Sequence, residues 1–434
     1  MSRDPVGLAL SAMTRFAANP LLDRLGLRSS VEKTAYHGTR AGFRTLALAG
    51  RGFNRVANWL PRKQLPEKAA PDLFNLTLDA DQQMIVDSLH RLAQETLRPA
   101  ASMADEARAM PAEVFEAAAS LGLTLYAIPS EFGGVAETSS PVTSVLIAEQ
   151  LAWGDMGLAV ALLAPFSVAQ ALSLWGTGEQ QSRYLPAFCE EHPPVATIAV
   201  DEPTALYDPM MPSTQATPTK SGYCLNGLKS GVVLGAESDL LLVSACLQGK
   251  PRVFLVEAGL PGIKIEAEPA MGLRAAQLAR LTLTNVELPL DALLGSEDFS
   301  FEMFLDRGAL LRCGLATGTA QAALDYVIPY CNNREAFGEP ISHRQSVAFM
   351  ISNLAIETDS MRLLTWRAAS RAETGQSYHR EACLAKLLCN EKAMEIGTNA
   401  VQLLGGHGFV KDHPVERWYR DLRSVATQQG GLHA

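Results

Sequence analysis

Amide and charged side chains are concentrated near the end of the chain, in the segment VQLLGGHGFVKDHPVERWYRDLRSVATQQGGLHA. Charged residues recur there at helical spacing, namely Glu416, Arg417, Arg420 and Asp421. This spacing predicts ion pairs that lock a bundle of helices. Gln429 then precedes a pair of glycines. An amide can hold a substrate by hydrogen bonds, but it cannot remove a proton as a carboxylate does. Whether the tail delivers a reactive group therefore depends on the chemistry that the rest of the chain supports.

Composition and missing motifs exclude several classes of function. The chain has 434 residues, 47% of them hydrophobic and 19% charged, which is typical of a globular protein of two or three domains. We find no GxxxxGK[ST], no GxGxxG after a strand, no HExxH and no GxSxG, so nucleotide hydrolase, nicotinamide, zinc protease and α/β-hydrolase activities are disfavoured. The seven cysteines form no CxxC pair, which indicates buried thiols in a reducing compartment.

Residues 1–72 form a basic extension, with about 12 Lys and Arg against about 4 Asp and Glu, although the net charge of the whole chain is −9. Its apolar and basic residues alternate at roughly helical spacing, which predicts a helical arm. The alternatives are peripheral contact with an anionic membrane and an Arg-rich transit peptide. No apolar run is long enough to span a membrane. We therefore expect a cytoplasmic protein, with membrane association or an organelle matrix as alternatives, and no nucleic-acid partner for the acidic body.

The periodicity of the remaining chain changes twice. Residues 73–196 show apolar residues three and four apart, as in helices. Residues 197–298 contain short runs such as SDLLLVSACL and ARLTLTNVELP between Gly, Pro and Asn turns, as in strands. Residues 299–434 return to long amphipathic helices. The sequence predicts an α+β multidomain protein with a helical N-terminal domain, a middle β-barrel or sandwich and a C-terminal four-helix bundle.

The body of the chain resembles the acyl-CoA dehydrogenase family. Seven motifs occur in the family's order: LGLTLYAIPSEFGG, LAWGDMGLA, WGTGEQQSRYLP, DEP with GYCLNGLKSGVVLGAESDLLLV, MGLRAAQLARLTLTNVELPLDALLG, REAFGEPISHRQSVAFMISNLA and VQLLGGHGFVKDHPVERWYRDL. The resemblance implies FAD bound at subunit interfaces of a homo-oligomer, a dimer or a tetramer. It also implies an acyl-CoA or acyl-carrier thioester as substrate, in a role in fatty acid and lipid metabolism. In such enzymes a carboxylate removes the α-proton, the β-hydrogen leaves as hydride to the flavin, and an electron-transfer acceptor reoxidises it.

The resemblance places an amide at the position of the catalytic base. The family's base is the Glu of a terminal EGT, and the corresponding residue here is Gln429. Some relatives carry the base early in the first helix of the C-terminal bundle, but that position corresponds to Gly308. Asp306 or Glu302 would serve only if the start of that helix were shifted. A positioned base is needed because the α-proton beside a thioester is only weakly acidic.

The flavin contacts implied by the resemblance are altered near the ring and kept near the dinucleotide. The family's aromatic-Ile-Thr segment becomes Gly231-Val232-Val233, and Asp201 replaces a threonine. An acidic Asp201 beside the ring would disfavour reduced, anionic flavin. Residues matching the pyrophosphate and adenosine contacts are Arg334, Phe337, Gln345, Gln402, Gly405 and Gly406. Arginine can neutralise a diphosphate, and glycine lets the backbone approach it.

Several functions remain open at this point. The first is an FAD-dependent dehydrogenase whose catalysis is impaired because Gln429 stands at the base position. The second is an incomplete subunit that forms a hetero-oligomer with an active homologue. The third is a flavin-free protein that binds an acyl thioester or acts as a scaffold. The fourth is flavin-dependent oxygenation, which needs no glutamate base.

Overall fold

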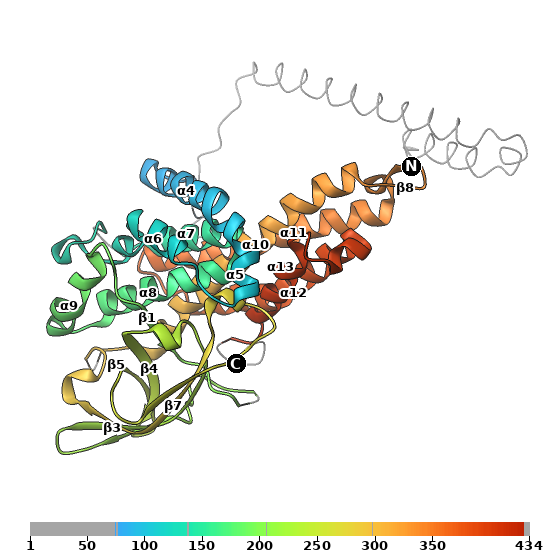
Figure 1. Ribbon diagram of the computed structural model, residues 1–434. Helices are drawn as coiled ribbons and strands as arrows, with labels where there is room; N and C mark the ends of the chain where they lie inside the picture. Colours follow the sequence, from blue (N-terminus) through green and yellow to red (C-terminus); the bar gives the residue numbers. More distant parts are fainter. Residues whose placement is uncertain (1–73, 75–76, 137–138, 205, 297, 429–434) are drawn as a thin grey trace, which may run out of the picture. The chain divides into compact units, whose positions relative to one another are not determined.

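The computed structural model describes residues 74, 77–136, 139–204, 206–296 and 298–428 (Figure 1). The predicted extension, residues 1–72, lies outside the described residues, and so does Gln429. The predictions for membrane contact and for the base position therefore stay predictions.

The first part of the described chain is helical. Its α-helices are α4 (Ala80–Leu92), α5 (Arg98–Ala107), α6 (Ala112–Ser120), α7 (Pro141–Gly154), α8 (Met156–Trp175) and α9 (Gly178–Tyr184). Local sequence sets where they begin: the Ser140 side chain accepts a hydrogen bond from the Thr143 N–H ahead of α7, and Asp155 accepts one from the Leu158 N–H ahead of α8. These caps satisfy N–H groups that have no partner within the helix.

By length and composition, helix α8 is apolar enough to cross a membrane. The prediction that no apolar run is long enough to do so was therefore wrong. Within the protein, 78% of its most apolar stretch is buried, and it packs against α7 and β1. A core helix of a globular domain has the same composition. The burial of α8 therefore explains its apolar sequence without a membrane.

The described strands of the middle region form one continuous mixed sheet of seven strands. They are β1 (Ala196–Ala199), β2 (Gln215–Pro218), β3 (Gly222–Val232), β4 (Leu240–Leu247), β5 (Lys250–Glu257), β6 (Ile263–Ala267) and β7 (Ala279–Pro289). The order is β1-β4-β2-β3-β7-β6, with β5 also paired to β4. Leu240 and Leu242 of β4 join the core of the helical region, whereas Leu241 and Val243 join the core of the sheet. This alternation attaches the sheet to the helices.

Four described helices form the C-terminal bundle: α10 (Phe301–Asn333), α11 (Gln345–Glu373), α12 (His379–Leu404) and α13 (Val415–Val425). A short hairpin of β8 (Glu335–Ala336) and β9 (Glu339–Pro340) connects α10 to α11. The predicted order of helices, strands and helices is thus confirmed (Figure 1).

Small residues on α10 bring the bundle close to α7. A Cβ on Gly318 would collide with the Glu149 carbonyl of α7, and one on Gly314 would lie 3.0 Å from both the Ala148 Cβ and the Val145 carbonyl oxygen. Glycine at these two positions permits the close helix contact. The sequence CGLATG therefore fixes α10 against the N-terminal helices, and α10 forms one wall of the cavity described next.

Candidate functional site

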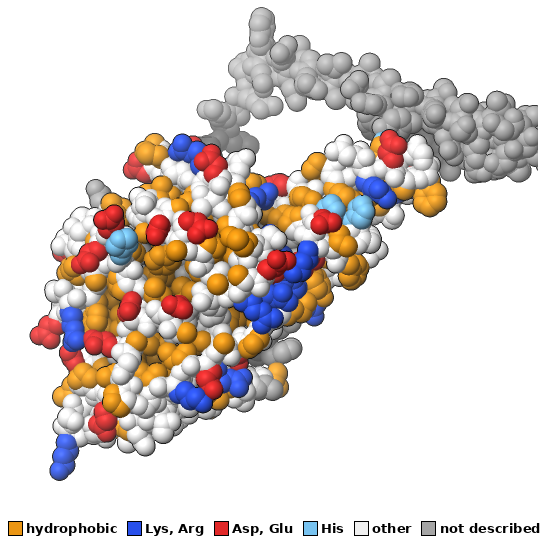
Figure 2. Space-filling model, viewed as in Figure 1, with side chains coloured by type: hydrophobic (Ala, Val, Ile, Leu, Met, Phe, Trp, Pro, Cys, Tyr) orange, Lys and Arg blue, Asp and Glu red, His pale blue; other side chains and the backbone are white. Residues whose placement is uncertain are grey.

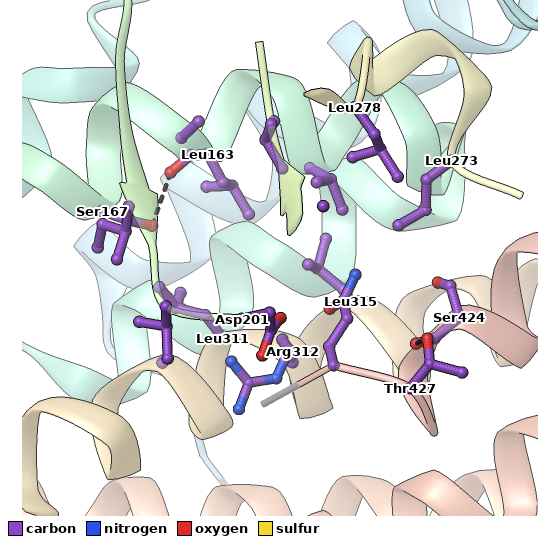
Figure 3. Close-up of a pocket in the computed structure, with 18 of the residues that line it drawn as sticks. Leu163, Ser167, Asp201, Leu273, Leu278, Leu311, Arg312, Leu315, Ser424 and Thr427 are labelled. Carbon is purple, nitrogen blue, oxygen red and sulfur yellow. Dashed lines mark hydrogen bonds between the residues drawn. The ribbon is translucent and has the colours of Figure 1, made fainter. Parts of the chain in front are cut away.

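A cavity of about 790 Å³ lies where the N-terminal helices, the sheet and the C-terminal bundle meet (Figure 3). It is lined by residues of α8, by the segments after β1 and β3, by Ala270–Leu273, by α10 and by the end of α13 with the residues that follow it. Leu163, Leu311 and Leu315 give it apolar walls, and Asp201 and Arg312 bring charge into it. A mainly apolar cavity between domains with a few polar groups is the usual form of a small-molecule site.

The backbone that carries Asp201 is fixed by a buried ion pair. The Lys229 ammonium lies 2.9 Å from the Glu202 carboxylate and also donates to the Val200 carbonyl and the Ser244 hydroxyl. Burial alone would raise the pKa of Glu202, but Lys229 and the donors of Thr214 outweigh it and hold that pKa below its ordinary value. Because every donor of Lys229 is used, this ion pair is a rigid support for the cavity wall.

Two arginines of α10 bring hydrogen-bond donors to the cavity. Arg307 and Arg312 both line it, and the Arg312 guanidinium lies beside Asp201 (Figure 3). Among the described residues, Nη2 of Arg312 and both Nε and Nη1 of Arg307 are buried without a hydrogen-bond partner. Burial lowers the pKa of Arg312, while Asp201 opposes that shift. Buried N–H groups without a hydrogen-bond partner are costly, so the site fits a polar or anionic ligand group.

The charged residues of α13 connect the bundle to the other two regions, beyond the bundle-internal pairing that the sequence predicted. Arg420 forms two 2.8 Å hydrogen bonds to Asp105 of α5 and also donates to Glu416 and to the Met271 carbonyl. Arg417 donates to Asp155 at 2.8 Å. This α13 network thus joins α13 to the N-terminal helices and to the loop at the cavity wall.

Asp421 is the member of this network whose protonation is expected to control stability. It is buried, and it accepts a hydrogen bond from the Leu273 N–H at 2.6 Å. Burial, together with the nearby Asp155 carboxylate, raises the pKa of Asp421 to about 7. Between the ordinary pKa of 3.8 and about pH 7, the folded state therefore holds a proton that the unfolded state has lost. The free energy of unfolding falls as the pH rises through this range.

We predict that Asp421→Asn removes this pH dependence, because asparagine keeps the acceptor oxygen for Leu273 and cannot ionise. Between about pH 4 and pH 7 the free energy of unfolding should fall more in the wild type than in the variant, with a difference in slope of up to about 1.4 kcal/mol per pH unit. Urea denaturation at several pH values measures it. Parallel curves for the two proteins would show that Asp421 does not titrate in this range.

The structure brings some of the predicted site residues to the cavity and not others. Asp201, Val233 and Gly308 line it, and the described chain ends at Gln428, which lines it too. Asp306 is not among the lining residues; its carboxylate hydrogen-bonds His379 of α12 at 3.0 and 3.1 Å. The shift of the helix that would turn Asp306 toward a substrate is not seen.

The predicted dinucleotide contacts lie at the other end of the bundle. Arg334 follows the end of α10, and Arg312 precedes it by 22 residues, which corresponds to about 33 Å along a helix. Phe337 is 95% exposed, and Gln345 and Gln402 are exposed as well. A Cβ on Gly405 or Gly406 would meet no atom of the described residues within 4 Å. Packing within the described part of the chain therefore gives no reason for Gly406, and the predicted dinucleotide contacts are not among the residues that line the cavity.

Comparisons with known proteins match almost all of the described chain. The models for the acyl-CoA dehydrogenase N-terminal, middle and C-terminal domains match residues 79–192, 197–286 and 300–431. The human mitochondrial short-chain specific acyl-CoA dehydrogenase is 30% identical over 370 residues, covering 82% of this chain and 88% of that protein. The chain belongs to the acyl-CoA dehydrogenase family.

Other known proteins are similarly close. Acryloyl-CoA reductase (NADH) of Anaerotignum propionicum is 30% identical over 368 residues, covering 82% of this chain and 93% of that protein. The structure of butyryl-CoA dehydrogenase from Megasphaera elsdenii superimposes with a TM-score of 0.75 at 28% identity, covering 83% of this chain and 97% of that one. These matches confirm the predicted fold and family. The family is one of flavoprotein oxidoreductases.

Sequence reasoning missed the two cavity arginines. Arg312 stands in the otherwise apolar and small stretch ALLRCGLATG, four residues after Gly308. A lone charge within a buried helical segment is unusual and was the available signal. Its partner Asp201 is more than 100 residues away in sequence, so only the packing of α10 against the segment after β1 reveals the pair.

Proposed function

We propose that this chain is an FAD-dependent oxidoreductase of the CH–CH group that binds an acyl thioester in the cavity and dehydrogenates it slowly, because Gln429 stands at the base position. The observation that carries the proposal is the cavity between the three regions that match the family, with the segment Ala426–Gln428 forming part of its wall. A relocated base at Asp306 is not supported by its position against His379.

The residues at the cavity fit a flavin. The unpartnered donors of Arg307 and Arg312 suit the carbonyl groups of the ring, and Ser230 and Gly231 border the same space. FAD, when bound, supplies the acceptor for the hydride that leaves the β-carbon. The chain's own residues hold the ligands, and the apolar walls from α8 and α10 exclude water from them.

The separation between the cavity and the bundle end supports FAD binding between subunits. One chain offers ring contacts at the start of α10 and, about 33 Å away, exposed dinucleotide contacts at its end. A second copy of the chain would supply the dinucleotide contacts that complete the FAD site. Exposed apolar side chains on α11 and α12 favour such a homo-oligomer: Phe349, Ile356, Leu363, Leu384 and Leu387. Figure 2 shows hydrophobic side chains among the charged ones on one face of the protein. Light scattering on the purified protein tests this, and a monomer would contradict it.

Asp201 and Arg312 should set the reduction potential of the bound flavin in opposite directions. Asp201→Asn removes a negative charge from the cavity and should raise the two-electron potential, by about 30 mV if the effect is about 1.4 kcal/mol. Arg312→Met should lower it. Reductive titration against dyes of known potential measures both, and a change of the same sign in both variants would contradict the assignment.

The proposed function is tested by the absorbance spectrum of the purified protein, followed by anaerobic addition of acyl-CoAs of several chain lengths. A flavin spectrum, perturbed at once by acyl-CoA and bleached slowly, is expected. Absence of flavin even after incubation with FAD would contradict the proposal and favour a subunit that works with an active homologue. An electron-transfer acceptor is required as a partner only if bleaching occurs.

A further inference from the structure

A group of metal-ligating side chains lies between the first turns of α10 and α12, apart from the cavity lining. Glu302 and Asp306 are four residues apart on α10, and His379 and Cys383 are four residues apart on α12. This spacing places each pair on one face of its helix. One ligand atom each from Asp306, His379 and Cys383 lies within 4.8 Å of the other two. Carboxylate, imidazole and thiol groups therefore converge from two helices.

The imidazole of His379 is held in the orientation that metal binding requires. Its Nδ1 lies 3.0 and 3.1 Å from the two oxygens of Asp306, whose side chain is only 8% exposed. A buried carboxylate that accepts a hydrogen bond from Nδ1–H leaves Nε2 with its lone pair and fixes the ring. Histidines that bind metals are commonly held by a carboxylate in this way.

The Nε2 atom faces two further donors at distances close to those of a tetrahedral site. It lies 3.7 Å from the Cys383 Sγ and 3.8 Å from the Glu302 carboxylate. With bonds of about 2.05 Å to nitrogen and about 2.3 Å to sulfur, a tetrahedral zinc ion separates these two ligands by about 3.6 Å. The corresponding nitrogen–oxygen separation is about 3.3 Å, so the Glu302 side chain, which is 53% exposed and lies outside the group of three mutually close ligand atoms, must rotate to join the site.

We propose that this chain binds a zinc ion through the His379 Nε2, the Cys383 thiolate and the Glu302 carboxylate, with Asp306 as the hydrogen-bond partner of His379. A set of one nitrogen, one sulfur and one oxygen ligand suits Zn²⁺ better than Mg²⁺ or Ca²⁺. The exposed side of His379 leaves a fourth position open to water. Lys386 is a nearby cation, one turn beyond Cys383. The negative charges of Glu302 and Asp306 offset its positive charge at Cys383.

The proposed zinc site clamps α12 to the start of α10. Arg307 and Gly308, which follow Asp306 directly, line the cavity. Metal binding would therefore hold the beginning of the cavity wall, although none of the metal ligands lines the cavity itself. This inference does not depend on the proposed dehydrogenase activity.

Cobalt(II) is the probe, because a tetrahedral cobalt–thiolate site has a near-ultraviolet charge-transfer band and strong visible bands. The full chain, stripped of metal with a chelator, is titrated with cobalt chloride, and difference spectra remove any flavin absorbance. We expect saturation at about one cobalt ion per chain, and displacement of the bands by zinc chloride. Zinc should also raise the melting temperature of the wild type.

Three variants separate this site from adventitious binding. Cys383→Ser should lose the charge-transfer band, and His379→Gln should lose cobalt binding. Cys224→Ser, which removes a thiol on β3, should keep both. His379 lies at the exposed start of α12, so its substitution should leave the metal-free protein folded, and its melting temperature without metal checks this. Absence of the charge-transfer band in the wild type, or its persistence in Cys383→Ser, would overturn the proposal.

Discussion

Gln429→Glu is expected to increase the rate at which an acyl-CoA bleaches the bound flavin by about 10²–10⁴-fold, the usual contribution of a positioned general base. Glutamate and glutamine have nearly the same shape, so the substitution changes the chemistry of the side chain more than its size. The α-proton beside the thioester can leave only if a base accepts it. Rapid mixing of acyl-CoA with the FAD-loaded protein under anaerobic conditions measures the rate.

The neighbouring residue supplies the matched control for this prediction. Gln428 is also an amide, and it lines the cavity. Gln428→Glu adds the same charge one residue earlier and should give no comparable gain if Gln429 corresponds to the family's base. A gain in the control variant alone would show that Gln428, and not Gln429, corresponds to the family's base. An FAD-loaded Gln429→Glu protein that binds acyl-CoA and still fails to bleach would show that the amide is not the main defect.

The fold could be predicted from the sequence because its signals are local. The change of period from helix to strand and back near residues 197 and 299 comes from side-chain burial along each element. The collinear motifs then identified the family. The position of β1, which pairs with β4 in the sheet and packs against α8, was not predicted. The parallel pairing of β1 with β4 depends on contacts between residues distant in sequence.

The candidate site was predicted only where a residue matches a family motif. Asp201, Val233 and Gly308 were placed by such matches, and all three line the cavity. Arg307 and Arg312 match no motif, so their role depends on the packing of α10. The same holds for the contact between Asp306 and His379, whose positions differ by 73 residues. Contacts between charged residues that are distant in sequence can be identified only when the positions of the helices are known.

The second large effect is expected for Arg420→Ala, which breaks the α13 network. Asp105 is 4% exposed and would lose both of its 2.8 Å hydrogen bonds, leaving Arg274 at 3.7 Å as its remaining ion-pair partner among the described residues. The Met271 carbonyl at the cavity wall would lose one of its two donors and keep the Arg274 Nε at 3.2 Å. Removing one partner of a buried ion pair leaves an uncompensated charge, and the free energy of unfolding should fall by about 3–5 kcal/mol.

Urea denaturation followed by tryptophan fluorescence measures this loss, because Trp418 is buried on the same helix. Arg423→Ala is the matched control. It removes an exposed arginine three residues further along the same helix, and it should change the free energy of unfolding by less than about 0.5 kcal/mol. Arg420→Lys keeps the charge but not the paired hydrogen bonds, so an intermediate loss is expected. If Arg420→Ala and Arg423→Ala unfold at the same urea concentration, the ion pairs of Arg420 contribute no net stability.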